Sequence, residues 1–386
     1  MDIVKNKTDC CGCYACSNIC PVNAIDMCSD EEGFWYPVIL QDKCINCQQC
    51  EKVCPTYNRP DSFSAKSSFG CYANKSEELM SSSSGGVFSV IARKIISCGG
   101  IVCGAAFNEE MEVVHTIIDS EQDLIRLKGT KYVQSRIGTV YSEIEQLLKT
   151  GKQVLFSGTP CQVAGLKSFL KKDYENLFCI DLICHGVPSP EVWRRYLCEI
   201  SNDKEVKNVV FRNKSKGISN ITLDYTLENG EVIQEKYSDS LYIKGFIQNL
   251  YLRPSCFECK FKGIDRCSDM TIGDFWAMKE YHPSEYQENG VSAVIIHSDK
   301  AEKLFAKISV DMKVVKSSIE EIGCWNECLF SSVQPNLKRT KFFSLLKDLS
   351  VLESIKQCIV VDSEQKKETN SGFILKIKSK ITNLLK

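Results

Sequence analysis

The sequence lacks the features that mark nucleic-acid-binding, secreted and membrane-spanning proteins. Its 48 Lys and Arg residues are balanced by 49 Asp and Glu residues, which leaves a formal net charge of only -1. Near neutrality argues against nucleic acid or a strongly acidic partner as the main ligand. No apolar stretch approaches the ~18 residues that a membrane span needs. Residues 1–6 also lack the apolar core of a secretory signal. We therefore expect a cytoplasmic protein with no transmembrane segment and no nucleic-acid partner.

Cysteine is the residue type in excess, with 23 among 386 residues. Because nothing in the sequence directs the chain to an oxidising compartment, disulfides are not expected and metal ligation is the remaining explanation. The rest of the composition, 43% hydrophobic and 25% charged, is that of an ordinary globular chain. Its length is sufficient for two or three hydrophobic cores.

One four-cysteine pattern that ends in proline occurs twice near the N-terminus. This C-x2-C-x2-C-x3-C-P spacing is that of bacterial ferredoxins, in which three close cysteines hold one 4Fe-4S cluster and the fourth ligates the other. Zinc sites share a single C-x2-C, but not eight positions in register with both prolines. The predicted ligands are Cys10, Cys13, Cys16 and Cys54 for the first cluster, and Cys44, Cys47, Cys50 and Cys20 for the second.

The chain is predicted to be α+β, with a small ferredoxin-like domain at 1–60, a polar linker at 61–68 and a larger α/β domain at 69–345. Within the larger domain, alternation of apolar runs predicts strands near 101–105, 113–118, 153–157 and 293–297. An antiparallel hairpin insertion is expected around Asn229-Gly230. Residues 346–386 are expected to form a helical tail that is flexible in part. Its basic amphipathic stretch at 373–381 is compatible with a membrane surface, a partner or solvent.

Several loops of the larger domain carry residues suited to binding a cofactor. A serine-rich loop at 81–86 precedes a predicted helix at 87–96, and a helix N-terminus binds phosphate. The alternative is an ordinary capped helix start. The loop at 157–162 follows a buried strand and carries a cysteine, and the segment at 180–189 has the same strand-then-turn form with a cysteine in its turn. A third C-x2-C occurs at Cys256 and Cys259. Four thiolates in loops suggest a third 4Fe-4S cluster.

At these loops the chain resembles the beta-subunit family of coenzyme F420 (deazaflavin) hydrogenases and dehydrogenases. The resemblance rests on four short motifs, which are Ser83-Ser84-Gly85-Gly86, Gly158-Thr159-Pro160-Cys161-Gln162, Cys184-His185-Gly186 and Gly273-Asp274-Phe275-Trp276. It implies that the larger domain binds FAD, with a 4Fe-4S cluster near the flavin ring. It also implies hydride transfer with a deazaflavin or a related small molecule.

Carried over residue by residue, the resemblance implies the following sites. The FAD phosphates would be bound by Ser83, Ser84, Gly85 and Gly86, with Lys131, Gln134 and Thr159 as further cofactor-binding residues. The third cluster would be held by Cys161, Cys184, Cys256 and Cys259, and Cys267 could replace any of these four. Cys11 fits no ligand spacing, and packing in the core is the preferred interpretation of Trp276. No side chain is expected to act as a nucleophile or general base.

The sequence thus predicts a FAD-dependent iron-sulfur oxidoreductase from an anaerobic host. It would pass electrons between a hydride-carrying small molecule, FAD, its 4Fe-4S clusters and a redox partner protein at the ferredoxin domain. The alternative is a non-catalytic subunit that relays electrons within a larger redox complex. A zinc-stapled binding module is a third hypothesis.

Overall fold

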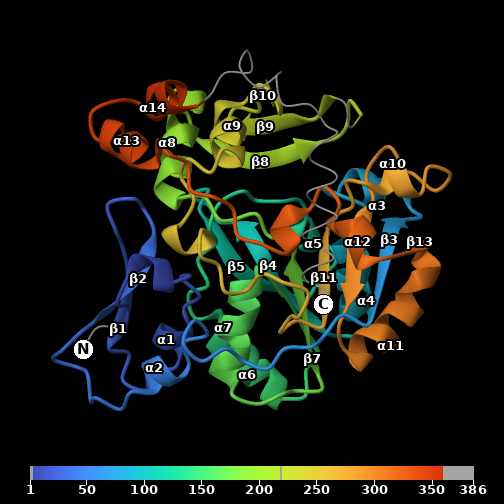
Figure 1. Cartoon of the computed structure of the whole chain (residues 1–386), viewed down its shortest axis with the longest axis horizontal. Helices are drawn as coiled ribbons and strands as arrows, with labels where there is room; N and C mark the ends of the chain where they lie inside the picture. Colours follow the sequence, from blue (N-terminus) through green and yellow to red (C-terminus); the bar gives the residue numbers. More distant parts are fainter. Residues whose placement is uncertain (1–2, 218–219, 360–386) are drawn as a thin grey trace.

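An eight-stranded mixed sheet forms the centre of the fold (Figure 1). The computed structural model describes residues 3–217 and 220–359 of the chain. The four inner strands β4, β6, β7 and β11 run parallel, and the flanking strands are antiparallel to their neighbours. In spatial order the strands are β13 (Met312–Ser317), β3 (Ser67–Ala73), β12 (Ser292–Ile296), β11 (Met270–Asp274), β7 (Leu177–Leu182), β6 (Val154–Gly158), β4 (Ile101–Phe107) and β5 (Val113–Ile118).

Both faces of this sheet are buried, as the continuous apolar runs of its inner strands require. In β6, Leu155 packs toward α4 (Val87–Ser97) and α11 (Asp299–Ile308). Its neighbours Val154 and Phe156 pack on the other face, with α6 (Val140–Lys149) and α7 (Pro160–Leu170). Alternate residues of one strand therefore belong to two separate cores. The shorter helices α3 (Ser76–Met80), α5 (Leu124–Leu127), α10 (Met278–Tyr281) and α12 (Ile319–Gly323) complete this layer arrangement.

The N-terminal segment is a small unit with an internal repeat. A hairpin of β1 (Ile25–Ser29) and β2 (Trp35–Ile39) accompanies the one-turn helices α1 (Ala15–Asn18) and α2 (Gln49–Lys52). Each of these helices follows a residue in the left-handed conformation, Tyr14 before α1 and Gln48 before α2. Trp35 is buried in the same core as helices α6 and α7. The ferredoxin-like segment and the α/β body therefore share one hydrophobic core.

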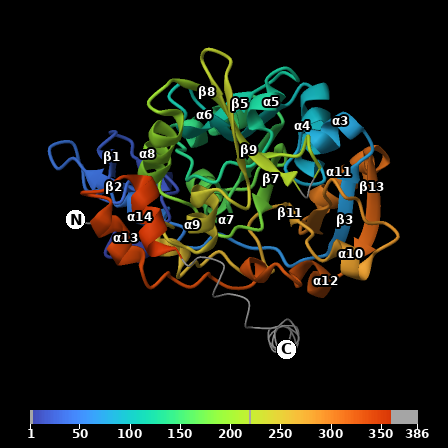
Figure 2. The same cartoon turned by 90° about the horizontal axis from the view of Figure 1, so that it is seen from above.

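A second, three-stranded sheet lies above the body and covers one end of it (Figures 1 and 2). Its strands β8 (Val206–Asn213), β9 (Thr222–Leu227) and β10 (Val232–Lys236) pair antiparallel, and β9 and β10 form a hairpin. Four helices pack against it through a core rich in aromatic side chains. They are α8 (Pro190–Ser201), α9 (Leu241–Ile247), α13 (Arg339–Leu345) and α14 (Val351–Cys358).

One expectation from the sequence was wrong in detail. Trp276 is not a core residue, because it is 55% exposed and the Arg212 guanidinium lies 5.6 Å from its ring centroid. The division of the chain at residues 60, 68 and 345 stays a prediction. The basic stretch at 373–381 lies outside the described residues.

No helix within residues 3–217 and 220–359 is both long enough and apolar enough to cross a membrane.

Candidate functional site

The eight cysteines of the ferredoxin-like segment line two separate hollows of similar size. Together with the open solvent inside it, the first spans about 400 Å³ and the second about 410 Å³. The first is lined by Cys10, Cys13, Cys16 and Cys54, and the second by Cys20, Cys44, Cys47 and Cys50. In each hollow three cysteines come from one motif and the fourth from the other. This grouping is the one that the ferredoxin spacing predicts, and four thiols suit a 4Fe-4S cluster.

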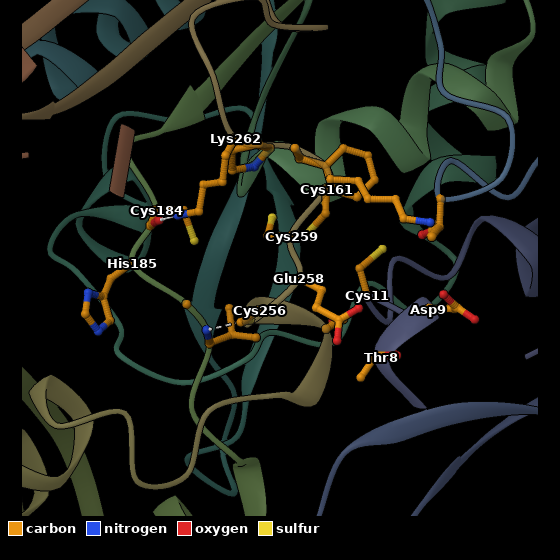
Figure 3. Close-up of a pocket in the computed structure, with 17 residues that line it drawn as sticks. Thr8, Asp9, Cys11, Cys161, Cys184, His185, Cys256, Glu258, Cys259 and Lys262 are labelled. Atoms are coloured by element: carbon orange, nitrogen blue, oxygen red, sulfur yellow. Dashed lines mark hydrogen bonds between the residues drawn. The ribbon is translucent and has the colours of Figure 1, made fainter. Parts of the chain in front are cut away.

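A third hollow, of about 560 Å³, opens between the ferredoxin-like segment and the α/β body (Figure 3). Its lining includes Cys161, Cys184, Cys256 and Cys259, which the resemblance named as one ligand set. Cys161 lies in the first turn of α7, directly after β6, and Cys184 follows the end of β7. The carboxyl ends of two adjacent parallel strands therefore meet at this hollow, where ligands of open α/β sheets gather.

The third hollow, which we call the third cradle, holds its four thiols half-buried. Burial raises the pKa of Cys256 to about 12 and that of Cys184 well above its ordinary value. The Val187 backbone N–H donates to Cys256 Sγ at 3.5 Å, and Thr159 Oγ1 lies 3.2 Å from Cys161 Sγ. Donors directed at sulfur favour a metal-bound thiolate and tune the potential of a cluster.

Cys11 also lines the third cradle, although no ligand spacing predicts it there. The same residue lines the first hollow, so its side chain stands where the two spaces meet. The only signal in the sequence is that Cys11 directly follows the ligand Cys10. The proposed substitute ligand Cys267 lies elsewhere, with its Sγ 3.6 Å from the Pro60 carbonyl oxygen.

Within the described residues, no group of three or more His, Cys, Asp or Glu side chains is arranged to hold a single metal ion. A cubane cluster places its four thiolates at separate corners and needs no such convergence.

His185 has a structural role in the turn after Cys184. Its Nε2–H donates to Asn249 Oδ1 at 2.6 Å, because the amide oxygen can only accept. Burial lowers the pKa of His185. The ring also packs edge-on against Phe246, with the centroids 5.0 Å apart.

The serine-rich loop makes many of its polar contacts within the protein. Ser83 Oγ accepts a hydrogen bond from the Thr130 N–H at 2.6 Å, and Ser84 Oγ donates to the Val291 carbonyl at 3.1 Å. The Gly85 N–H donates to Ser292 Oγ at 2.9 Å, and a Cβ on Gly85 would lie 2.2 Å from the Cys71 carbonyl oxygen. Gly85 is therefore required for close packing against strands β3 and β12.

Lysine side chains surround the same loop. Lys128 Nζ lies 3.1 Å from Ser81 Oγ and 2.8 Å from the Glu78 carboxylate. Lys214 is buried, and its ammonium donates to the carbonyls of Leu79 and Ser84 at 2.8 and 3.0 Å. Burial lowers the pKa of Lys214 to about 8. These charges lie beside the N-terminus of α4, whose first N–H groups have no partner within the helix.

The other two residues expected near FAD have different surroundings. Lys131 Nζ donates to the carbonyls of Arg126 and Lys128 at 2.9 and 2.8 Å, and so satisfies carbonyls at the end of α5. Gln134 contacts the ferredoxin-like segment, because its Nε2 donates to the Cys11 carbonyl at 3.3 Å. The structure brings Ser83 to the segment at 129–131, but no hydrogen bond between described residues joins Gln134 to residues 83–86. Thr159 is the N-cap of α7, where it forms a capping box with Gln162.

Comparison with protein families agrees with this division of the sites. Residues 9–58 match the family described as "4Fe-4S dicluster domain". Residues 151–321 match the family described as the C-terminal part of the beta subunit of coenzyme F420 hydrogenase/dehydrogenase. The region at 151–321 is thus similar to the C-terminal part of the coenzyme F420 hydrogenase/dehydrogenase beta subunit. A region that matches a 4Fe-4S dicluster domain therefore precedes the region that matches the beta subunit.

Among solved structures, a chain of the F420-reducing nickel-iron hydrogenase complex from Methanosarcina barkeri is similar to this one. The two are 15% identical with a TM-score of 0.44, over 76% of this chain and 91% of that chain. No curated protein matches the sequence.

Proposed function

We propose that this beta-subunit relative is a FAD-dependent oxidoreductase with three 4Fe-4S clusters. It passes electrons between a hydride-carrying small molecule, of the deazaflavin type or related to it, and a ferredoxin-like partner protein. The observation that carries the proposal is that the predicted cluster ligands line three hollows, two of which, the third cradle and the first hollow, adjoin at Cys11. Adjacent one-electron carriers of this kind form an electron path.

The third cluster is assigned to Cys161, Cys184, Cys256 and Cys259. These four thiols line one hollow at the carboxyl ends of β6 and β7. Lys262 stabilises the backbone next to Cys184. Its ammonium donates to the Cys184 carbonyl, and to the Cys328 carbonyl at 2.9 Å. This contact fixes the turn that presents Cys184.

FAD is assigned to the loop at 83–86 and the N-terminus of α4. Since the Ser83 and Ser84 hydroxyls are engaged within the protein, the pyrophosphate would be held by the free N–H groups of α4 and by Lys128. When bound, FAD exchanges hydride with a small molecule and single electrons with a cluster. The chain's own residues bind the cofactor and exclude water, and none is assigned as a nucleophile or general base.

The partner protein is assigned to the surface around the second hollow. Cys47 is exposed there, and the apolar side chain of Ile45 is 60% exposed. Val22, on the same hollow, is also exposed. An accessible cluster ligand within an apolar patch suits a short-lived contact with another electron carrier.

One observation favours the alternative of a non-catalytic relay subunit. The two serine hydroxyls and the Gly85 N–H of the loop already have protein partners. A relay needs only the three clusters and no flavin.

Anaerobic purification followed by acid denaturation distinguishes the two functions. Release of about one FAD per chain supports the oxidoreductase, and full iron without flavin supports the relay. A Lys128→Gln variant should lose flavin while keeping its iron. Lys94→Gln, in the last turn of the same helix α4, is the matched control and should keep both. Equal flavin content in the two variants would contradict the phosphate assignment.

A further inference from the structure

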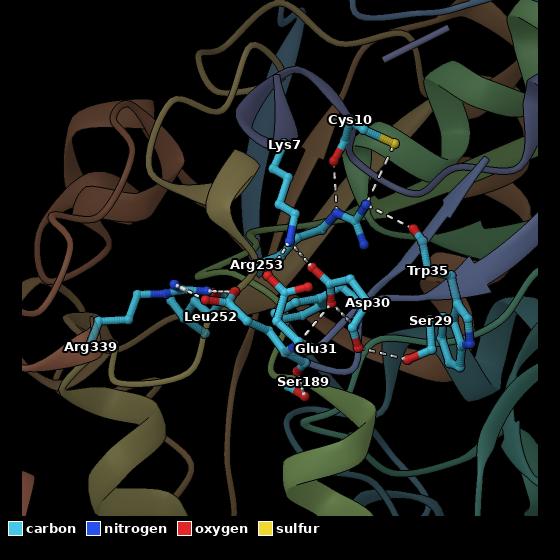
Figure 4. A network of polar contacts seen from close by, with 12 residues as sticks. Lys7, Cys10, Ser29, Asp30, Glu31, Trp35, Ser189, Leu252, Arg253 and Arg339 are labelled. Atoms are coloured by element: carbon cyan, nitrogen blue, oxygen red, sulfur yellow. Dashed lines mark hydrogen bonds and ion pairs between the residues drawn. The ribbon is translucent and has the colours of Figure 1, made fainter. Parts of the chain in front are cut away.

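Arg253 is a fully buried cation, 0% exposed, that lies directly on a predicted cluster ligand (Figure 4). Its Nε donates to the Cys10 carbonyl at 2.7 Å, and its Nη2 lies 3.5 Å from Cys10 Sγ. The remaining donors reach the Trp35 carbonyl at 2.9 Å and Gln134 Oε1 at 3.0 Å. The guanidinium also stacks over the Tyr36 ring, 4.3 Å from its centroid.

No carboxylate within the described residues forms an ion pair with Arg253, although most other arginines that the structure describes have one. Removing a charge from water without a counter-charge is costly. The hydrogen bonds from neutral oxygens and the aromatic face satisfy its donors but leave the charge uncompensated. An anionic group next to Cys10 therefore completes the environment of this side chain, and a thiolate-ligated cluster is such a group.

The second hollow has no comparable cation. Among residues 3–217 and 220–359, no Lys or Arg side chain hydrogen-bonds to Cys20, Cys44, Cys47 or Cys50. The donor found there is the Ala24 backbone N–H, 3.2 Å from Cys20 Sγ. The two cluster sites, which the sequence presents as near repeats, therefore differ in charge.

We propose that Arg253 is the counter-ion of the cluster held by Cys10 and raises the reduction potential of that cluster above that of the second cluster. This proposal rests on the proposed function, because it requires a cluster on Cys10. Each added electron makes a cluster more negative, so a fixed cation in a low-dielectric site favours the reduced form.

Arg253 also belongs to the turn that presents a ligand of the third cradle. The Cys256 N–H donates to the Arg253 carbonyl at 2.9 Å. Arg253 thus contacts the third cradle through its backbone and the first hollow through its guanidinium.

Arg253→Gln tests the charge, because glutamine keeps a hydrogen-bond donor and removes the cation. Clusters are followed by electron paramagnetic resonance during an anaerobic potentiometric titration, and the Cys10 cluster is identified as the signal that Cys16→Ala removes. We expect the reduced-to-oxidised ratio of this cluster at a fixed potential to fall at least tenfold, a shift of about 59 mV for a one-electron couple. The second cluster should keep its potential.

The matched control is Arg339→Gln. Arg339 pairs with Glu32 on the same face of the ferredoxin-like segment and has no contact with a cluster ligand among its hydrogen bonds. It should leave both potentials unchanged. An unshifted Cys10 cluster in Arg253→Gln, with full iron content, would overturn the proposal.

If Arg253→Gln fails to load iron, Arg253→Lys distinguishes a role of the charge from a role in packing. Lysine restores the positive charge but lacks the planar guanidinium group. If Arg253→Lys recovers the cluster, Arg253 acts as a counter-ion. If both variants lose the cluster equally, the counter-ion proposal is wrong and Arg253 is needed for packing. Iron and sulfide counts on the unaltered protein separate this proposal from the proposed function. If the unaltered protein holds no iron, the proposed function fails; if it holds iron and the potential does not move, only the role of Arg253 fails.

Discussion

The ferredoxin-like segment docks against the body at Gly33, and a single methyl group there should weaken the docking. Gly33 has φ +83°, and a Cβ would lie 2.2 Å from Glu191 Cβ and 2.8 Å from Ser189 Oγ. Ser189 and Glu191 are at the start of α8, so the clash is with a rigid element. It also displaces Glu32, whose backbone carbonyl accepts from Ser189 Oγ at 2.5 Å.

The magnitude follows from two separate costs of Gly33→Ala. A non-glycine residue in the left-handed region costs about 1–2 kcal/mol, and overpacking of a fixed contact adds about 1–3 kcal/mol. Gly230→Ala isolates the first cost, because Gly230 also has φ +83° and nothing lies within 4 Å of its Cβ position. The difference between the variants is therefore about 1–3 kcal/mol, which corresponds to a roughly 5- to 150-fold larger undocked population.

Trypsin cleavage in the segment at 58–66 under native conditions measures this population, since cleavage follows the open form when closing is fast. The bond that trypsin can cut there follows Lys66, since the bond after Arg59 precedes Pro60. Lys66 is held in the closed form, because its ammonium pairs with Asp299 and its backbone N–H donates to the Ile296 carbonyl at 2.8 Å. Gly33→Ala should be cut at least fivefold faster than Gly230→Ala, with equal iron content. Equal cleavage rates would refute the inference that this contact holds the two parts together.

Three further predictions concern the third cradle and the core behind it. Cys256→Ser should lower the iron content from about twelve to about eight per chain, whereas Cys267→Ser should leave it unchanged; a reversed result would exchange their roles. Thr159→Val should lower the free energy of unfolding by about 1 kcal/mol through loss of the α7 cap. It should also lower the potential of the third cluster, and Thr159→Ser should restore both; an unchanged potential would contradict the contact with Cys161. Burial lowers the pKa of His115 to about 4 in the folded state. Below pH 6.5 the unfolded chain therefore binds a proton on this imidazole, whereas the folded protein does not. Urea unfolding should show that His115 lowers stability by about 1.4 kcal/mol per pH unit between pH 6.5 and pH 4, and not further below pH 4; a His115→Gln variant with the same slope would contradict this.

The parts of the fold that the sequence predicts well are those set by local pattern. The inner strands β4 and β6 are apolar runs ended by turns, and their predicted positions at 101–105 and 153–157 agree with the structure to within a few residues. The ferredoxin segment follows from the spacing of its cysteines, and the match over residues 9–58 agrees with it. Cys161 and Cys184 share the third cradle because the turns after parallel strands β6 and β7 meet at one sheet edge.

The contacts that join the two parts of the chain were beyond sequence reasoning, because they connect residues distant in sequence. Gly12 and Gly165 illustrate this: a Cβ on Gly12 would lie 2.6 Å from Gln134 Nε2, and one on Gly165 2.8 Å from Cys13 Cβ. Neither glycine belongs to a turn signal that marks an interface. Arg253 is likewise an ordinary residue before Pro254 until the fold buries it on Cys10. Trp276 was misjudged because an aromatic residue after a buried strand usually continues the core.

Iron and sulfide counts on anaerobically purified protein test the central claim, that three cysteine-lined hollows in one chain each hold a 4Fe-4S cluster. Three such clusters require about twelve irons and about twelve acid-labile sulfides per chain. About eight of each would mean that the third cradle holds no cluster, and a protein with zinc and no sulfide would contradict the account as a whole.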